Sequence, residues 1–560
     1  MPLPATRIHG VDGLWEVTRT VDRAVVIGLD GATFDVIDPM VARGELPNMA
    51  RVLDRGARGT LESSIPPVTA PAWVSFMTGV NPGKHGIFNF SELSPDAIRR
   101  GVRHLITSRS IKSPTIWEIV DRAGGRTVAI NVPVTYPCWP IRGCMISGVP
   151  APTKDDAFVH PPALLSALEN ALGEYPLEQN PPRGVPVDLN EWTRRYRGIE
   201  EQRHRAATYL IDRDEWDLFV VVYGLTDRIQ HLCWSHYRHG GALEEAIPEA
   251  YRTVDRWIGE LMAKVGDETT VLVMSDHGFG DLDKAFCTTR WLNEHGFLCY
   301  AKPRWPGIGA GLAVRRATVG RILSRCGFGG LAARLPDRFQ GIVVRLPMLR
   351  TGGNGIDWEK SDAFAGNFGI YINVRDGGAG AASGGGEYGD LRRRIASELE
   401  RLVDLETGEC VVDTISFREE VYCGEFAELA PDILFQMKEM RYQQHNRPTC
   451  RELFTTQTGG THRMDGILIA AGPHAASGAR FEKASLVDIA PTLLYLLGLP
   501  VPAAMDGRVL IEGLDEELLR SREVKVTEAE IARIDLEERG YRKDEEEAIM
   551  RQLAGLGYLD

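Results

Sequence analysis

Short apolar runs recur along the chain, and most of them end in Gly, Asp or Pro. The most continuous runs are 24–29, 127–134, 218–223, 269–274 and 467–471. Segments with apolar residues at helical spacing lie between them, for instance 47–54, 115–123 and 247–264. Continuous apolar runs are typical of parallel strands that are buried on both faces. The pattern therefore predicts an α/β fold, a three-layer sandwich with a mostly parallel central sheet.

The pattern changes in two places. Residues 301–350 hold ten Lys or Arg and one acid, and "GGAGAASGGGEYGD" at 377–390 predicts a flexible loop. Beyond 510 the chain is charged and helical in pattern, with Thr527 and Glu530 spaced as a capping box. We expect five parts: an N-terminal extension 1–22, a first core part 23–300, an inserted cap or lid 301–454, a last core part 455–510, and a helical tail 511–560 packed on the surface.

Composition narrows the class of protein. With 25% charged residues, 43% hydrophobic residues and a net charge of -13, the chain is typical of a soluble globular protein and not of a general nucleic-acid binder. Nine scattered cysteines without a C-x-x-C pair suggest neither a disulfide framework nor a thiolate zinc site. The first 22 residues lack the apolar centre of a signal peptide, and no uncharged apolar run reaches about 18 residues. We expect a cytoplasmic protein that does not span a membrane.

Acidic residues and a histidine follow three of the predicted strands. Asp30 comes after 24–29, Asp227 comes after 218–223, and Asp276 with His277 comes after 269–274. The carboxyl ends of parallel strands meet at one edge of the sheet, where ligands bind. These side chains are therefore expected to converge.

Two further histidines extend this set. His231 lies four residues after Asp227, so both side chains share one face if a helix starts there, and both can bind one metal ion. An N-terminal Asp and an ordinary helical His remain the alternative. His462, in "GGTHRMDGILIAAGP", precedes the last predicted strand and is a candidate imidazole ligand.

A hydroxyl is placed where an anion could bind. In "IPPVTAPAWVSFMTGVNPGKHGIFNF" (65–90), Thr69 stands at the turn into an amphipathic segment. Free N–H groups and the helix dipole favour an anion at such a position. The alternative is that Thr69 only caps the helix.

In their order, these motifs resemble the alkaline phosphatase superfamily, specifically its type I phosphodiesterase and nucleotide pyrophosphatase branch. The resemblance rests on Asp30, on Thr69 with "TGVNPGKHG" behind it, on D-x-x-x-H at 227–231, on "SDHGF" and on "THRMDG", and covers 22–300 and 455–505. It implies an alkaline-phosphatase-like sandwich and hydrolysis of phosphodiester or phosphoanhydride bonds in a small anionic phosphorus-containing substrate.

The resemblance also implies two Zn²⁺ ions, with Mn²⁺ as the lesser possibility. Asp227, His231 and His462 would hold one ion. The other would be held by Asp30, Asp276, His277 and the hydroxyl of Thr69. Thr69 would attack phosphorus and form a phospho-threonine intermediate, which water then hydrolyses.

One departure keeps other functions open. Nucleotide pyrophosphatases of this branch usually follow the nucleophile as T-F-P-N, and here Thr69 precedes Ala70, Pro71 and Ala72, which puts nucleotide specificity in doubt. The alternatives are a phosphomonoesterase or a phosphonate hydrolase of the same superfamily and, from another class, an inactive metal- or anion-binding protein. A cofactor-independent phosphoglycerate mutase fits less well, because that branch uses Ser in a different local context.

Substrate contacts and partners are less defined. Weak candidates are Arg315, Arg316 and Arg321 of the basic segment 301–350, which could form a lid over the metals, lie on an anionic membrane surface, or pair with the acidic tail. Lys84, His85 and Arg228 are expected to be structural. The sequence leaves the oligomeric state open.

Overall fold

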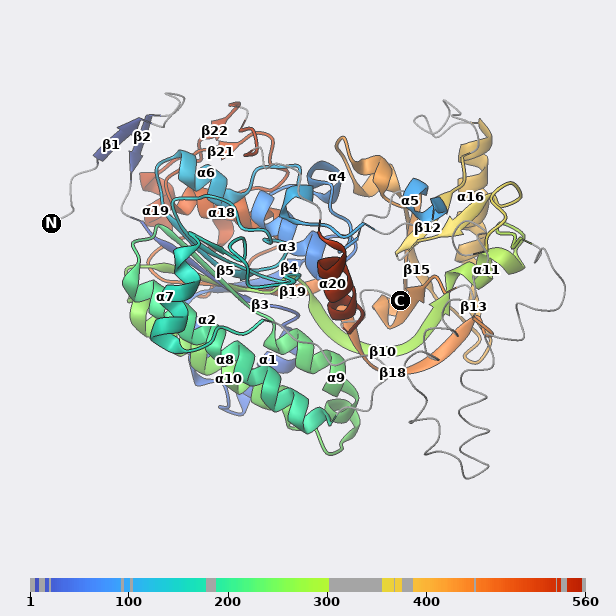
Figure 1. The fold of residues 1–560 in the computed structure, drawn as a ribbon, viewed down its shortest axis with the longest axis horizontal. Helices are drawn as coiled ribbons and strands as arrows, with labels where there is room; N and C mark the ends of the chain where they lie inside the picture. Colours follow the sequence, from blue (N-terminus) through green and yellow to red (C-terminus); the bar gives the residue numbers. More distant parts are fainter. Residues whose placement is uncertain are drawn as a thin grey trace.

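A nine-stranded sheet forms the centre of the computed structural model (Figure 1). The structure describes residues 6–9, 16–19, 22–91, 95–100, 104–177, 188–301, 355–366, 368–374, 386–447, 450–529, 531–534 and 541–555. In spatial order the strands are β20 (Ala484–Ser485), β4 (Ala57–Glu62), β19 (Asp465–Ala471), β9 (Thr270–Met274), β3 (Ala24–Leu29), β8 (Leu218–Tyr223), β5 (Thr127–Val132), β6 (Gly143–Ser147) and β7 (Val159–His160).

The middle of this sheet is parallel. β9, β3, β8, β5 and β6 all pair in parallel, whereas β19 is antiparallel to both of its neighbours and β7 is antiparallel to β6. The predicted mostly parallel sheet is therefore confirmed. The run expected at 127–134 ends earlier, because Asn131 and Val134 adopt positive φ angles that do not continue a strand.

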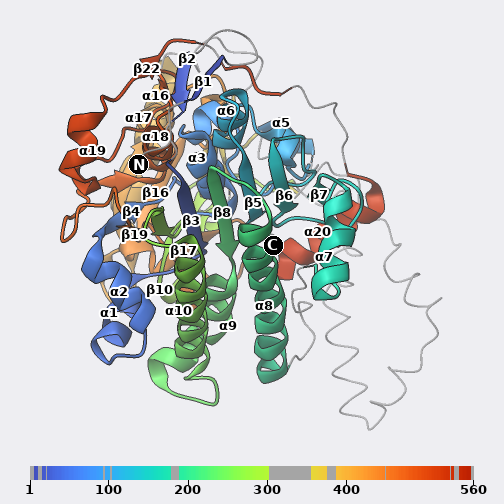
Figure 2. The same ribbon diagram turned by 90° about the vertical axis from the view of Figure 1, so that its left-hand side faces the viewer.

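Helices cover both faces of the sheet, as Figure 2 shows. Alternate residues of β3 enter opposite cores: Val25 and Ile27 pack in one apolar cluster, and Ala24 and Val26 pack in the other. The first face is covered by α1 (Phe34–Ala42), α2 (Pro47–Arg55), α8 (Leu189–Arg213), α9 (Leu225–His239) and α10 (Ala246–Val265). The second face is covered by α3 (Thr69–Thr78), α6 (Ile116–Arg122) and α18 (Ile489–Leu496). The strands are apolar throughout because both of their faces are buried.

A long antiparallel ribbon leads from this core into a third apolar cluster, that of the cap. β10 (Gly278–Cys287) pairs with β18 (Phe454–Arg463) on one side and with β17 (Tyr442–His445) on the other. The cap at its far end has a four-stranded sheet of β11 (Ala363–Ala365), β12 (Gly369–Ile372), β16 (Ile433–Met437) and β15 (Val412–Phe417). Helices α11 (Thr288–Glu294) and α16 (Gly386–Glu400) pack against it.

Smaller elements complete the described chain. They are β1 (Thr6–His9), β2 (Glu16–Arg19), α4 (Pro82–His85), α5 (Pro95–Arg100), α7 (Ala163–Leu172), β13 (Val403–Asp404), β14 (Glu409–Cys410), α17 (Arg418–Val421), β21 (Val501–Pro502), α19 (Glu516–Ser521), β22 (Val526–Thr527) and α20 (Lys543–Gly555).

The apolar cluster of the cap includes residues that precede the predicted boundary at 301. Phe286, Trp291 and Phe297 pack in the cap cluster, so the packing places its start nearer 287 than 301, although the division into parts stays a prediction. Residues 386–390, expected in a flexible loop, begin α16, and 377–385 lie outside the described residues. Residues 302–350 of the basic segment also lie outside them.

The C-terminal tail differs from its prediction. Thr527 lies in β22, which pairs with β21, so it does not start a helix as a capping box would require; Glu530 lies outside the described residues. Ile549 and Leu553 of α20 are 0% exposed and pack in the core cluster beneath α3. The tail therefore contributes apolar contacts to the core. Among the helices of the described chain, none has the length and apolar character to cross a membrane.

Candidate active site

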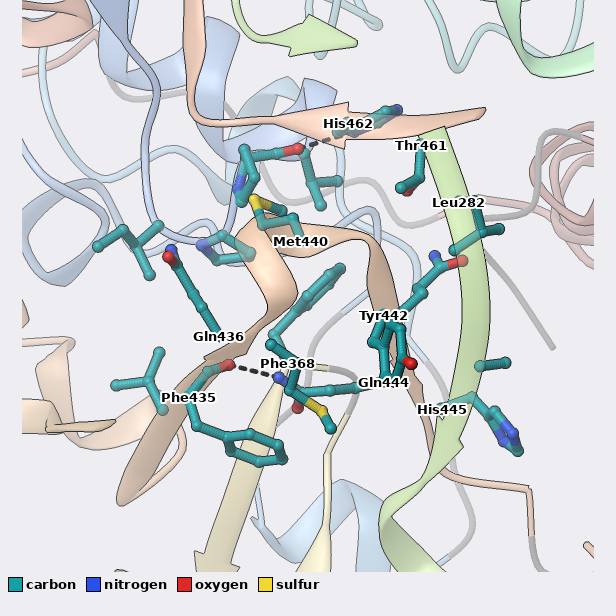
Figure 3. A pocket seen from close by; sticks show the side chains of 18 of the residues that line it. Leu282, Phe368, Phe435, Gln436, Met440, Tyr442, Gln444, His445, Thr461 and His462 are labelled. Carbon is teal, nitrogen blue, oxygen red and sulfur yellow. Dashed lines mark hydrogen bonds between the residues drawn. The ribbon is translucent and has the colours of Figure 1, made fainter. Parts of the chain in front are cut away.

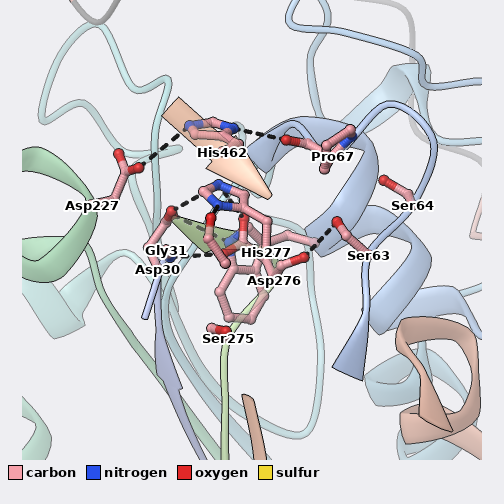
Figure 4. Close-up of polar contacts among 12 residues, drawn as sticks. Asp30, Gly31, Ser63, Ser64, Pro67, Asp227, Ser275, Asp276, His277 and His462 are labelled. Atoms are coloured by element: carbon pink, nitrogen blue, oxygen red, sulfur yellow. Dashed lines mark hydrogen bonds and ion pairs between the residues drawn. The ribbon is translucent and has the colours of Figure 1, made fainter. Parts of the chain in front are cut away.

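Three of the predicted ligands meet at the ends of two adjacent parallel strands. β3 leads to Asp30, and β9 leads to Asp276 and His277. Nε2 of His277 lies 3.3 Å from Oδ2 of Asp276 and 3.5 Å from Oδ1 of Asp30 (Figure 4). All three side chains are buried. The predicted convergence at this edge of the sheet is therefore present.

The other three ligands form a second group beside the first. Asp227 lies in the first turn of α9, and Nε2 of His231, one turn later, is 3.2 Å from its Oδ1. Nε2 of His462, near the end of β18, lies 3.5 Å from the same oxygen and 2.9 Å from Nε2 of His231. The rings of His277 and His462 stack with centroids 3.6 Å apart, so the two groups adjoin.

Surrounding groups fix the orientation of these side chains. The indole of Trp73 donates to Oδ2 of Asp30 over 3.3 Å, and the N–H of Gly31 donates to Oδ1 of Asp276 over 3.2 Å. Nδ1 of His462 bonds the carbonyl of Pro67 at 2.7 Å, which directs Nε2 toward the site. Such outer contacts are typical of metal sites, because they hold each ligand in one orientation.

Four buried atoms at the centre make no hydrogen bond, and the contacts given above are with other candidate ligands. They are Oδ1 of Asp30, Oδ1 of Asp227, Oδ2 of Asp276 and Nε2 of His277. Buried polar atoms are nearly always satisfied, and leaving them unpaired is costly. A cation among these atoms would remove that cost, and the mixture of imidazole and carboxylate suits Zn²⁺. The residues present therefore fit a pair of metal ions.

The electrostatics point the same way. Burial raises the pKa of Asp30 and Asp276 well above its usual range, and repulsion from neighbouring carboxylates adds to the shift. Burial would also raise the pKa of Asp227, but His231, His462 and Arg228 together lower it well below its usual range. Three carboxylates buried this closely favour a cation between them.

Thr69 is the first residue of α3 and is 0% exposed. The N-cap of this helix is Val68, so the interpretation of Thr69 as only a cap is wrong. The carbonyl that His462 binds belongs to Pro67, two residues before Thr69. This contact connects the start of α3 to the second group of ligands.

A cavity of about 610 Å³ opens beside these groups, between the core and the cap (Figure 3). His231 and His462 line it on the core side, and the cap contributes amides, hydroxyls and rings such as Gln436, Gln444 and Tyr442. Of the described residues that line it, Arg447 alone carries a formal charge. Arg315, Arg316 and Arg321 lie outside the described residues.

Asn89 is a cavity residue that sequence reasoning missed. It is 2% exposed and lines the cavity together with Pro67 and Val68, the residues that precede Thr69. Its Oδ1 accepts the N–H of Phe90 over 2.7 Å, which fixes the orientation of the amide. A single Asn in "GIFNF" gives no periodic or spacing signal.

The weak candidates near the site separate into two kinds. Lys84 pairs with Asp506, and Nε2 of His85 lies 3.0 Å from the hydroxyl of Ser75, so both are structural, as expected. Arg228 differs, because its guanidinium donates to Oδ2 of Asp227 over 2.6 Å. It therefore holds one of the candidate ligands in place.

Comparisons with known proteins identify the family and the fold. The sequence pattern of the family described as type I phosphodiesterase / nucleotide pyrophosphatase matches residues 24–336. A phosphonoacetate hydrolase from Sinorhizobium meliloti, solved with phosphonoformate, is 16% identical with a TM-score of 0.51, and the match covers 88% of this chain and 99% of that chain. Human ectonucleotide pyrophosphatase / phosphodiesterase 5 is 12% identical with a TM-score of 0.50, and the match covers 88% and 100%. These likenesses confirm an alkaline-phosphatase-like fold.

A shorter match is to a curated protein. The 2,3-bisphosphoglycerate-independent phosphoglycerate mutase of Cereibacter sphaeroides is 41% identical over 68 residues, which is 11% of this chain and 13% of the mutase. The chain thus spans only about an eighth of the length of the curated relatives that it matches.

Proposed function

Because the chain belongs to the type I phosphodiesterase/nucleotide pyrophosphatase family, we propose that it hydrolyses a phosphodiester or phosphoanhydride bond of a small anionic substrate through Thr69. The observation that carries the proposal is that four buried atoms of Asp30, Asp227, Asp276 and His277 make no hydrogen bond and face other candidate ligands, beside the helix that Thr69 begins.

Seven residues make up the proposed centre. Asp227, His231 and His462 would hold one Zn²⁺, and Asp30, Asp276, His277 and Thr69 would hold the other, with Mn²⁺ as the second choice. When bound, two such ions supply the positive charge that phosphoryl transfer requires. The three imidazoles support zinc over a metal that prefers oxygen ligands alone.

The chain's own groups account for the covalent step. Oγ1 of Thr69 would give up its proton and form a bond to phosphorus as the bond from phosphorus to the leaving oxygen breaks. The leaving oxygen would depart with the bonding electrons and take up a proton through water. Water then displaces Thr69 and releases the phosphorus product. In this proposal the N–H groups at the start of α3 and the amide of Asn89, which lines the cavity, would donate to the phosphoryl oxygens.

The cavity supports a diester over a monoester. Apart from Arg447, the described residues on its cap side offer neutral hydrogen-bonding and apolar groups, which suit an uncharged substituent on phosphorus. We also keep a reducing, cytoplasmic location as part of the proposal, because the eight cysteines among the described residues are free thiols.

Metal analysis coupled to a substrate panel tests the proposal. Purified protein should bind zinc, lose activity on exhaustive chelation and regain it with Zn²⁺. On a panel of diesters, monoesters, pyrophosphates and phosphonates, kcat/KM should be highest for a diester or a pyrophosphate. Full activity after verified metal removal would refute the metal-dependent mechanism, and a clear preference for monoesters or phosphonates would assign the protein to one of the alternative activities.

A further inference from the structure

A second cluster of metal-binding side chains lies at the far end of the β10–β18 ribbon. Cys287 ends β10, His445 ends β17, and Cys450 lies in the segment before β18. One ligand atom from each lies within 4.8 Å of the others, and Sγ of Cys450 is 3.6 Å from Nδ1 of His445. Cys287 is buried, and the other two are half-buried.

We propose that Cys287, His445 and Cys450 bind a zinc ion, separate from the two at the proposed active site. A tetrahedral zinc site with Zn–S of about 2.3 Å and Zn–N of about 2.0 Å places its ligand atoms about 3.5–3.8 Å apart. The separation of Cys450 and His445 matches this spacing. The fourth ligand is the carbonyl oxygen of Arg447 or a water molecule. That carbonyl oxygen lies 3.1 Å from Sγ of Cys450 and 3.5 Å from Sγ of Cys287.

The three ligands are held by rigid neighbours. Cys287 and His445 are direct partners in the parallel register of β10 and β17. The first turn of α11 binds the segment that carries the third ligand: Thr289 donates to the carbonyl of Asn446 over 2.9 Å, and Arg290 donates to that of Cys450 over 3.4 Å. Preorganised backbone of this kind reduces the ordering that metal binding would otherwise require.

The position of the cluster gives it a structural role. The chain leaves the ribbon after Cys287 and returns through Cys450, so these two residues stand at the two crossings into the cap. A metal ion shared between them closes the long cap loop and stabilises the native chain, because fewer unfolded conformations remain available. The cluster lies about 30 Å along β10 from His277, at about 3.4 Å per residue. His445 and Cys450 also line the cavity that His231 and His462 line, so the cluster borders that cavity, but none of its three residues belongs to the proposed catalytic centre.

Cobalt substitution distinguishes this site from the others. The proposed active-site ligands are carboxylates, imidazoles and a hydroxyl. Of the proposed metal sites, only that of Cys287, His445 and Cys450 can therefore give thiolate-to-cobalt charge-transfer absorption in the near ultraviolet. We expect that band when reduced, metal-free protein is titrated with Co²⁺. We also expect three zinc ions per chain in the zinc-loaded protein, falling to two in Cys450→Ser.

Matched controls make each outcome decisive. Cys410→Ser and Cys423→Ser alter exposed thiols on the cap and should keep the band and the metal count. Cys450→Ser should lose both, together with several degrees of thermal midpoint that added zinc does not restore. Absence of the band in the wild-type protein overturns the proposal even if the variant fails to fold. The proposal is also overturned if the band persists in Cys450→Ser. The same holds if the purified protein has lost two free thiols to a Cys287–Cys450 disulfide.

Discussion

Thr69 combines complete burial with the first position of α3, the helix whose Trp73 donates to Asp30. We predict that Thr69→Ala keeps the fold and bound zinc but lowers kcat by at least about a thousandfold, since loss of a nucleophile from a concerted unit commonly has effects of this size. Thr78→Ala is the matched control, because it removes a buried hydroxyl from the same helix, where it bonds only the carbonyl of Val74 over 2.7 Å. Comparable turnover in Thr69→Ala and Thr78→Ala would refute the assignment.

The buried carboxylates predict that metal binding releases protons. Burial, with repulsion between the groups, raises the pKa of Asp30 and Asp276, so metal-free protein keeps protons on them at pH values where an ordinary aspartate is ionised. Zinc binds the ionised form, so binding must expel these protons, and apparent affinity must fall as pH is lowered. Burial lowers the pKa of His231 and His277, which keeps these imidazoles neutral near neutral pH.

A pH-stat titration measures this release. Adding ZnCl₂ to chelator-treated protein at about pH 6 should liberate about one or more protons per chain, and the release should shrink as the starting pH rises. Asp30→Asn should reduce the number of protons released. Stoichiometric zinc binding without proton release would contradict the prediction.

At the scale of elements, the spacing of β10 and β18 controls the positions of the two stacked imidazoles. A Cβ on Gly460 would lie 2.3 Å from the ring of Phe279 and 2.6 Å from Trp234, whereas one on Gly459 meets nothing within 4 Å. Gly460→Ala should therefore lower the free energy of unfolding by about 1–3 kcal/mol and displace the strand that carries His462. Gly459→Ala should leave stability nearly unchanged.

Thermal unfolding and zinc affinity of the two variants test this prediction. The substitutions are chemically identical and lie one residue apart, so a difference between them reports packing against β10 rather than β-strand propensity. If Gly459→Ala and Gly460→Ala have the same thermal midpoint and the same zinc affinity, the ribbon accommodates the added methyl group without loss of stability, contrary to the prediction.

The elements also show what the sequence could and could not reveal. Strands such as 24–29 could be predicted because both faces of the sheet are buried and the runs are therefore apolar throughout. Asp30, Asp227 and Asp276 could be predicted because each follows a strand. Asn89 and the Cys287–His445–Cys450 cluster were not found, because tertiary packing brings them to their sites without a local spacing rule. Thr527 shows the converse: its capping spacing with Glu530 is present, but pairing with β21 overrides it.

At the scale of the whole molecule, Arg447 is the one formally charged group among the described residues that line the cavity, which raises the question of what else attracts an anionic substrate. The basic segment 301–350 remains the predicted lid. Replacing Arg315, Arg316 and Arg321 with Ser should raise KM for a charged diester more than for an ester with an uncharged leaving group. The effect should shrink with added salt, since the screening length is about 8 Å at physiological ionic strength.

Exposed arginines elsewhere on the cap provide the control for this prediction. Arg393→Ser and Arg401→Ser remove charge from the cap surface. They should change KM little for either the charged diester or the ester with an uncharged leaving group. Equal changes for both substrates in the triple variant would rule out the lid. Co-sedimentation with anionic vesicles that the triple variant abolishes would instead support contact with a membrane surface.

The pairing of Phe286 with Phe454 marks the end of the β10–β18 ribbon, where the cap is inserted. β10 and β18 pair like the two arms of a hairpin, with the whole cap in the place of a turn. Such a position tolerates long inserts because the entropy of closing a loop grows only slowly with its length. All seven residues of the proposed centre lie outside that insert. An ancestor with a short turn here would already have carried the complete ligand set. Exchange of the insert among its descendants would change which molecules reach Thr69 and would leave the metal ligands untouched.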